Sequence, residues 1–329
     1  MLKKSAWIVL AAALLAVLPV RFYQVVFLKG ETGGAFASAV VPCALAAGAV
    51  LLFAVGFLLG REKPEYRPFR SLPAALLSVL SGLALVVQSL VSLAVDGTSH
   101  QFIYMILSLL GILAGMVLIF TGYGYSVGRN VFAGHPLAAL LPPLWGCFCL
   151  FSLFVAYVGI VNVAQNVYNT LAVVFLLLFL FTQAKLFAGV ESGKAAQRVR
   201  MFALPAVLFL FTTGIPGSAA SLAGVRQSGF FPAGLYFVNV IMAFNILAFL
   251  AAYGSAPREA APKHAAPKEP ERKEPRDFVP LETTAPEPAA RPEEKSEWDR
   301  CWERLTAAYG SREMFVPCES DSFPLKNEK

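Results

Sequence analysis

Polar side chains that could bind a ligand are few in residues 1–253, and several of them lie near one end of an apolar run. Gln88 lies inside such a run, about eight residues before its end, and Asn162, Gln165 and Asn166 surround the turn between two later runs. If the folded chain brings these amides together, they line a shallow polar cavity that opens at that end. The alternative is an ordinary hydrated turn, with Gln88 hydrogen-bonded to a neighbouring helix.

Two charged residues of opposite sign lie at the same end of the apolar runs. Arg21 lies near the end of the first run, and Asp96 closes the third. A charge at the centre of a membrane helix costs roughly 2.5–3.5 kcal/mol on insertion scales, so such charges usually pair or serve a function. We therefore consider an ion pair between Arg21 and Asp96. The alternative is two charges that are solvated separately.

The sequence carries no recognisable catalytic, metal-binding or nucleotide-binding motif. Its histidines do not form a His-Glu-x-x-His helix, and no glycine-rich loop ends in Lys-Ser or Lys-Thr. Cys147 and Cys149 are two residues apart, which places their thiols on nearly opposite faces of a helix. We therefore expect no enzyme activity, no cofactor and no metal site. The basic charge reflects membrane topology rather than nucleic-acid binding.

Eight apolar stretches must position these polar groups. Hydrophobic residues make up 57% of the chain and charged residues 15%, against about 45–50% and about 25% in soluble domains. A helix needs about 20 apolar residues to cross a bilayer, and lipid offers no partner to an open backbone. The sequence therefore predicts an all-α membrane bundle of about eight helices in residues 1–253. The expected spans are 6–27, 36–59, 72–95, 102–121, 137–161, 170–189, 201–220 and 230–253.

Lysine and arginine residues in the short connections predict the orientation of the bundle. With the N-terminus in the cytoplasm, eleven of them face inward, and only Arg21, Lys29 and Arg226 face outward. The reverse orientation inverts this ratio. We therefore expect a multi-pass protein of the inner cell membrane with both termini in the cytoplasm. The span pattern resembles that of uncharacterised multi-pass bacterial inner-membrane proteins with basic cytoplasmic loops, a general resemblance that implies no activity and no site residues.

Glycine spacing in two runs predicts close packing of helices. Gly56 and Gly60 are four residues apart, and so are Gly111 and Gly115. Glycines on one face let two helix backbones approach closely. Packing inside the same bundle is the first interpretation, and a homo-oligomer is the second. Prolines near the start of the third, fifth and seventh runs indicate either a two-span duplication or simply a stack of spans that obey the charge rule.

Residues 254–329 differ in composition from the rest of the chain. Residues 254–295 are rich in Pro, Glu, Lys and Ala, so they bury too little apolar surface to fold, and we expect a disordered cytoplasmic linker. Within 296–329, residues 296–310 predict a short amphipathic helix, with a capping serine at its start and a glycine at its end. Its apolar face carries Trp298, Trp302, Leu305 and Tyr309.

Two functions of different classes are compatible with this pattern. The first is a non-enzymatic scaffold, assembly or signalling component that recruits a cytoplasmic protein through the apolar face of helix 296–310. That helix has three acidic and two basic residues, which favours a protein groove over an anionic lipid surface. The second is a transporter or channel for a neutral or lipid-like substrate, with the polar amides at its entrance.

Overall fold

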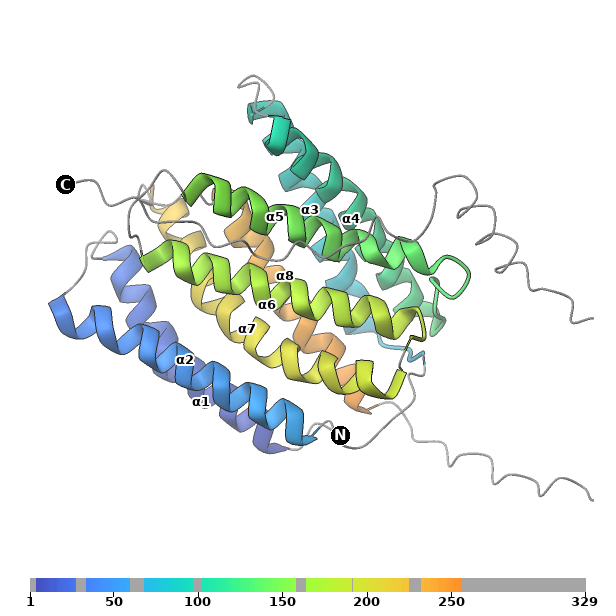
Figure 1. The fold of residues 1–329 in the computed structure, drawn as a ribbon, viewed down its shortest axis with the longest axis horizontal. Helices are drawn as coiled ribbons and strands as arrows, with labels where there is room; N and C mark the ends of the chain where they lie inside the picture. The colour runs from blue at the N-terminus through green and yellow to red at the C-terminus, as the bar shows by residue number, and fades with distance from the viewer. Residues whose placement is uncertain are drawn as a thin grey trace, which may run out of the picture. The chain divides into compact units, whose positions relative to one another are not determined.

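The computed structural model describes residues 4–27, 34–59, 68–96, 102–157, 164–190, 192–224 and 232–255. All regular structure in these ranges is helical (Figure 1). The helices are α1 (Lys4–Val26), α2 (Gly34–Leu59), α3 (Leu72–Asp96), α4 (Phe102–Val127), the short 3-10 helix η2 (Pro136–Leu140), α5 (Leu141–Tyr157), α6 (Ala164–Phe187), α7 (Ser192–Leu222) and α8 (Ala233–Ser255). Helix 296–310 and almost all of the linker at 254–295 lie outside the described residues.

The eight α-helices are long and apolar enough to cross a membrane. Their backbone groups are paired within each helix, which is the condition for crossing lipid in this form. The prediction of an all-α, multi-pass membrane bundle is therefore confirmed.

Two helices begin earlier than the apolar pattern predicts. α7 begins at Ser192 rather than near residue 201, so Lys194, Arg198 and Arg200 lie on the helix and not in the preceding loop. The intervening alanines favour helix, and long basic side chains can extend toward water from the last turns of a span. α6 begins at Ala164, so Asn166 lies on its first turn rather than in a turn between helices.

Six helices pack as a ring, in which each of α3 to α8 contacts the next and α8 closes on α3. The pair α1 and α2 lies outside this ring, and both helices pack against α7. α7 therefore contacts α1, α2, α6 and α8, and 83% of its most apolar window is buried inside the protein, against 22% for α1. The bundle is organised around α7.

Aromatic side chains fill the inner part of the six-helix ring. Tyr125 of α4 lies 6.0 Å from Phe249 of α8, measured between ring centroids, and Phe179 of α6 lies 5.9 Å from the same ring. Phe69, which precedes α3, stacks on Tyr125 at 4.9 Å. Because α4, α6 and α8 are alternate members of the ring, contacts among them cross its interior. The interior is thus packed with rings rather than left open along these residues.

The α3–α4 contact depends on missing side chains. A Cβ on Gly115 would lie 2.7 Å from the carbonyl oxygen of Gly82, and a Cβ on Gly82 would lie 2.5 Å from that of Gly115. A Cβ on Gly111 would collide with the Ser89 hydroxyl. α3 of the same chain therefore covers the face that carries Gly111 and Gly115, so this face is not available to a second copy.

Gly56 lies at a similar crossing between α2 and α7. A Cβ at this position would lie 2.8 Å from the carbonyl oxygen of Arg200. The guanidinium of Arg200 lies over the ring of Tyr253, with 5.5 Å between Cζ and the ring centroid. Gly60, the second glycine of the expected pair, lies outside the described residues.

Candidate functional site

Arg21 is a buried cation inside a membrane-spanning helix. Its side chain is only 6% exposed, five residues before the end of α1. The guanidinium lies over the ring of Tyr168 of α6, with 4.3 Å between Cζ and the ring centroid. Its Nη1 donates a hydrogen bond to Oε1 of Gln24 at 3.3 Å. Since Gln24 is one helical turn further along α1, both side chains extend from the same face.

One edge of this guanidinium has no hydrogen-bond partner. Nε and Nη2 of Arg21 are both buried and unpaired. These two nitrogens form the side edge of the planar group, and their hydrogens point in the same direction. That edge matches two oxygens of a carboxylate or a phosphate. A buried donor without a partner costs about 1–3 kcal/mol, and more when it is charged.

A hydrogen bond between α6 and α8 lies beside Arg21. Nδ2 of Asn169 donates to the hydroxyl of Tyr236 at 3.2 Å, and both side chains are almost fully buried. Tyr236 also lies close enough to Arg21 for the two side chains to interact electrostatically. A Cβ on Gly217 of α7 would collide with the Tyr236 ring, so this glycine lets the ring lie against α7. We define the Arg21 cluster as Arg21, Gln24, Tyr168, Asn169 and Tyr236.

Three further buried polar atoms, near the start of α6, near the end of α7 and in the first half of α8, have no hydrogen-bond partner. They are Oδ1 of Asn166, Oγ of Ser218 and Nδ2 of Asn239. Asn166 precedes Tyr168 on α6, Ser218 follows Gly217 on α7, and Asn239 follows Tyr236 by three residues on α8. Unpaired buried polar atoms are uncommon in folded proteins, and each calls for an explanation. Each of the three residues therefore lies within three positions of Tyr168, Gly217 or Tyr236 in the sequence.

Gln88 lies on α3, and its amide lies against the start of α8. Its Nε2 donates to the hydroxyl of Ser92 at 3.0 Å, one turn further along α3. The amide lies against Gly234, where an added Cβ would collide with it. Gln88 therefore has a partner on its own helix and a close neighbour on α8. No contact of Gln88 with Asn166 is found among the described interactions.

The remaining predicted residues are described only in part. Asn162 lies outside the described residues, and the side chains of Gln165 and Asp96 do as well, although both residues lie on helices. The polar cavity at this end and the ion pair between Arg21 and Asp96 therefore stay predictions. The helices give the ion pair little support, since α1 packs on α2 and α7 while α3 packs on α4 and α8.

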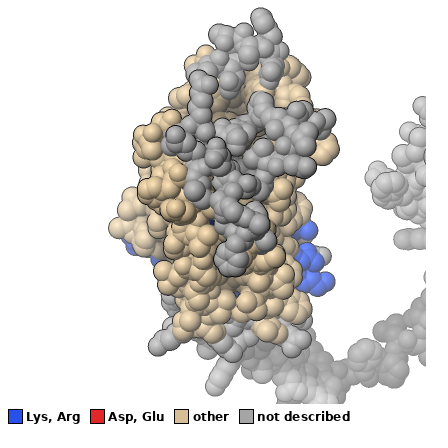
Figure 2. Space-filling model, turned by 90° about the vertical axis from the view of Figure 1, so that its left-hand side faces the viewer, with Lys and Arg blue, Asp and Glu red and all other residues tan. Residues whose placement is uncertain are grey.

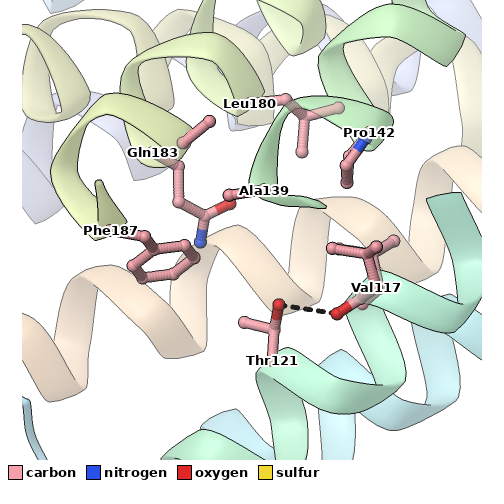
Figure 3. Close-up of a pocket in the computed structure, with 9 residues that line it drawn as sticks. Val117, Thr121, Ala139, Pro142, Leu180, Gln183 and Phe187 are labelled. Carbon is pink, nitrogen blue, oxygen red and sulfur yellow. Dashed lines mark hydrogen bonds between the residues drawn. The ribbon is translucent and has the colours of Figure 1, made fainter. Parts of the chain in front are cut away.

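A cavity found among the described residues lies at the other end of α6. It has a volume of about 10 Å³ and is bounded by α4, η2, α5 and α6 (Figure 3). Nε2 of Gln183 donates to the hydroxyl of Tyr125 at 3.0 Å, and the Thr121 hydroxyl donates to the carbonyl of Val117 at 2.8 Å. A volume of about 10 Å³ holds about one water molecule. The cavity is too small for a substrate.

Acidic groups are scarce in the part of the chain that the structure describes. Figure 2 shows Lys and Arg at the edges of the face in view and no Asp or Glu among the coloured atoms of that face. No three His, Cys, Asp or Glu residues of the described ranges gather in a way that could hold a metal ion. Cys149 is buried while Cys147 is exposed, so the two thiols face different surroundings.

Sequence reasoning found Arg21 but missed its surroundings. The sequence contains two short features that belong to these surroundings. They are the Tyr168-Asn169 pair in α6 and the Pro216-Gly217 pair in α7. Without the helix packing, nothing indicates that Tyr168 and Gly217 belong near Arg21 and Tyr236. Gly234 was missed for the same reason, because its close neighbour Gln88 is far away in the sequence.

No protein-family model matches this chain, and comparisons with curated proteins and with solved structures found no similar protein.

Proposed function

We propose that this chain is a non-enzymatic scaffold, assembly or signalling component of the inner cell membrane, with both termini in the cytoplasm. It recruits a cytoplasmic protein through the apolar face of helix 296–310. The observation that carries this proposal is the spacing of Trp298, Trp302, Leu305 and Tyr309, which places two tryptophans on one helix face. Two tryptophans on one face of a predicted helix suit a hydrophobic groove of a partner.

The packing of the bundle supports a scaffold over a catalyst or a passage. The rings of Tyr125, Phe179 and Phe249 fill the interior of the six-helix ring where α4, α6 and α8 meet. The cavity beside Gln183 holds about one water molecule at about 10 Å³. A bundle whose interior is packed in this way is suited to a structural role rather than to the passage of a substrate.

A photoreactive phenylalanine at position 309 tests the recruitment directly. In intact cells, we expect irradiation to crosslink the full-length chain to a discrete cytoplasmic protein. The double variant Trp298→Ala and Trp302→Ala should lose this product, because both anchors are removed. The matched control is Arg300→Ala with Glu303→Ala, which changes the opposite face and should leave the product unchanged. Equal crosslinking by all three proteins would refute the recruitment.

A transporter or channel for a neutral or lipid-like substrate is the second candidate. The observation in its favour is the set of buried unpaired atoms at Asn166, Ser218 and Asn239. In a variant whose native cysteines are replaced, Gln88→Cys and Asn166→Cys should then react with a water-soluble thiol reagent added outside. If neither reacts while a cysteine at exposed Ala223, just after α7, does, water does not reach these positions and the transport proposal fails.

A further inference from the structure

Two consecutive prolines interrupt the backbone hydrogen bonds where η2 passes into α5. In a continuous helix, the carbonyl of Ala139 accepts from the N–H three or four residues further along the chain. Those two residues are Pro142 and Pro143, and neither has an N–H to donate. Ala139 is only 4% exposed. Its carbonyl therefore needs a partner from outside the helix, and ordered water is one that membrane helices use beside proline.

Gln183 of α6 brings a second acceptor to the same place. Its Nε2 donates to the hydroxyl of Tyr125 at 3.0 Å, which fixes the orientation of the amide. In Figure 3 the amide oxygen of Gln183 lies on the side of Ala139, and the nitrogen lies on the other side. Ala139, Pro142 and Gln183 all line the cavity of about 10 Å³. The cavity is therefore bordered by a helix whose carbonyl lacks its backbone donor and by a side-chain amide oxygen.

The size and the lining of the cavity select its occupant. A volume of about 10 Å³ holds about one water molecule. The Thr121 hydroxyl also lines the cavity, but it donates its proton to the carbonyl of Val117 at 2.8 Å. The occupant must therefore supply the protons, because two acceptors cannot bond to each other. No carboxylate is among the described lining residues, so a bound cation would lack a counter-charge.

We propose that this cavity binds one structural water molecule, which donates one hydrogen bond to the carbonyl of Ala139 and the other to Oε1 of Gln183. The water joins α6 to the start of α5 at the point where the two prolines prevent the backbone from pairing with itself. A buried water of this kind makes two to four hydrogen bonds and belongs to the fold. The proposal uses no residue of helix 296–310 and stands apart from the proposed recruitment of a partner.

X-ray radiolysis of the purified full-length chain in a neutral detergent tests the water. Radiation converts a bound water into a hydroxyl radical, which oxidises the nearest side chain, and mass spectrometry measures the rate at each residue. Phe187 lines the cavity, so its ring should be oxidised. The control ring is Phe179, which is buried on the same helix and packs on Phe249 away from the cavity lining. We expect Phe187 to be oxidised several-fold faster than Phe179.

Two variants each remove one acceptor of the water. Pro143→Ala supplies the missing N–H, which can then bond to the carbonyl of Ala139. Gln183→Met removes the amide oxygen and nearly keeps the size of the side chain. Each variant should lower the oxidation rate of Phe187 several-fold. The matched control is Pro136→Ala, which changes an exposed proline outside the cavity lining and should leave the rate unchanged.

Three outcomes would overturn the proposal. Equal oxidation of Phe187 and Phe179 in the unchanged chain would mean that no water lies in the cavity. Fast oxidation of Phe187 that persists in Pro143→Ala would mean that the water reaches the ring from bulk solvent. An equal loss in Pro136→Ala would indicate a general change of η2 rather than the loss of one acceptor. If Gln183→Met does not fold, Pro143→Ala decides alone, because its new N–H completes a regular helical bond.

Discussion

Gly115 has no space for a side chain, because α3 passes directly over it. A Cβ here would lie 2.6 Å from Cγ2 of Val86 and 2.7 Å from the Gly82 carbonyl oxygen. Gly115→Ala must therefore push two backbones apart, and we expect a loss of about 1–3 kcal/mol in the free energy of unfolding. The measurement is the thermal unfolding midpoint in detergent.

Gly134 provides the matched control for this substitution. It has no heavy atom within 4 Å of an added Cβ, so Gly134→Ala should leave the unfolding midpoint unchanged. Equal midpoints for Gly115→Ala and the unchanged chain would show that α3 and α4 do not pack as closely as described here.

The bond between Gln183 and Tyr125 joins α6 to α4 across 3.0 Å inside the ring. Hydrogen bonds between membrane helices contribute about 0.6 kcal/mol on average. We expect Gln183→Leu and Tyr125→Phe each to lower the free energy of unfolding by about this amount, and the double variant to lose less than the sum. Strict additivity in this double-mutant cycle would mean that the bond does not form.

At the level of single residues, the sequence indicates which groups are unusual but not what they contact. Arg21 stands out as a cation in an apolar run, and separate solvation in water is a reasonable alternative for it from the sequence. The structure buries it at 6% exposure against Tyr168, which is nearly 150 residues away along the chain. Side chains of this kind are fixed by tertiary packing, which local patterns do not encode.

Helices α1 and α2 form a pair that docks on α7, and an engineered disulfide can test the contact between α1 and α2. A Cβ on Gly48 would lie 3.5 Å from the Cβ of Ala13, which is within the range for a disulfide. With the native cysteines replaced, Ala13→Cys with Gly48→Cys should crosslink under mild oxidation. A shift in gel mobility that reduction reverses is the readout.

The control pair places the second cysteine on the other side of α2. Val50 is 68% exposed, so Ala13→Cys with Val50→Cys should remain reduced under the same conditions. If the control pair forms the bond and the pair at 13 and 48 does not, α2 is rotated relative to the orientation found here.

The existence of the helices follows from apolar length, but their ends do not. α7 extends nine residues further toward the N-terminus than its apolar run, because Lys194 and Arg200 continue a helix that hydropathy alone would end. α5 is preceded by the 3-10 helix η2, which begins at Pro136. Insertion into lipid favours apolar residues, whereas the ends of a helix depend on backbone geometry and caps. The end of an apolar run and the end of its helix therefore need not coincide.

For the whole molecule, the eight spans and the charge distribution predict a common side for both termini. A fluorescent protein fused after Lys329 should be bright, because it folds in the cytoplasm. Alkaline phosphatase fused after Gly224, which follows the seventh span, should be active because that point faces outward. An active phosphatase after Lys329 would invert the orientation, and phosphatase activity at both points would contradict an eight-span path.

The central place of α7 has a consequence for biosynthesis. α1 and α2 leave the ribosome first, yet the surface on which both of them pack is encoded by Ser192–Leu222. The opening hairpin must therefore remain in the bilayer as an independent pair while four more helices are inserted. A nascent chain released before the seventh helix would expose that hairpin without its docking surface, which makes such fragments natural targets for membrane quality-control proteases.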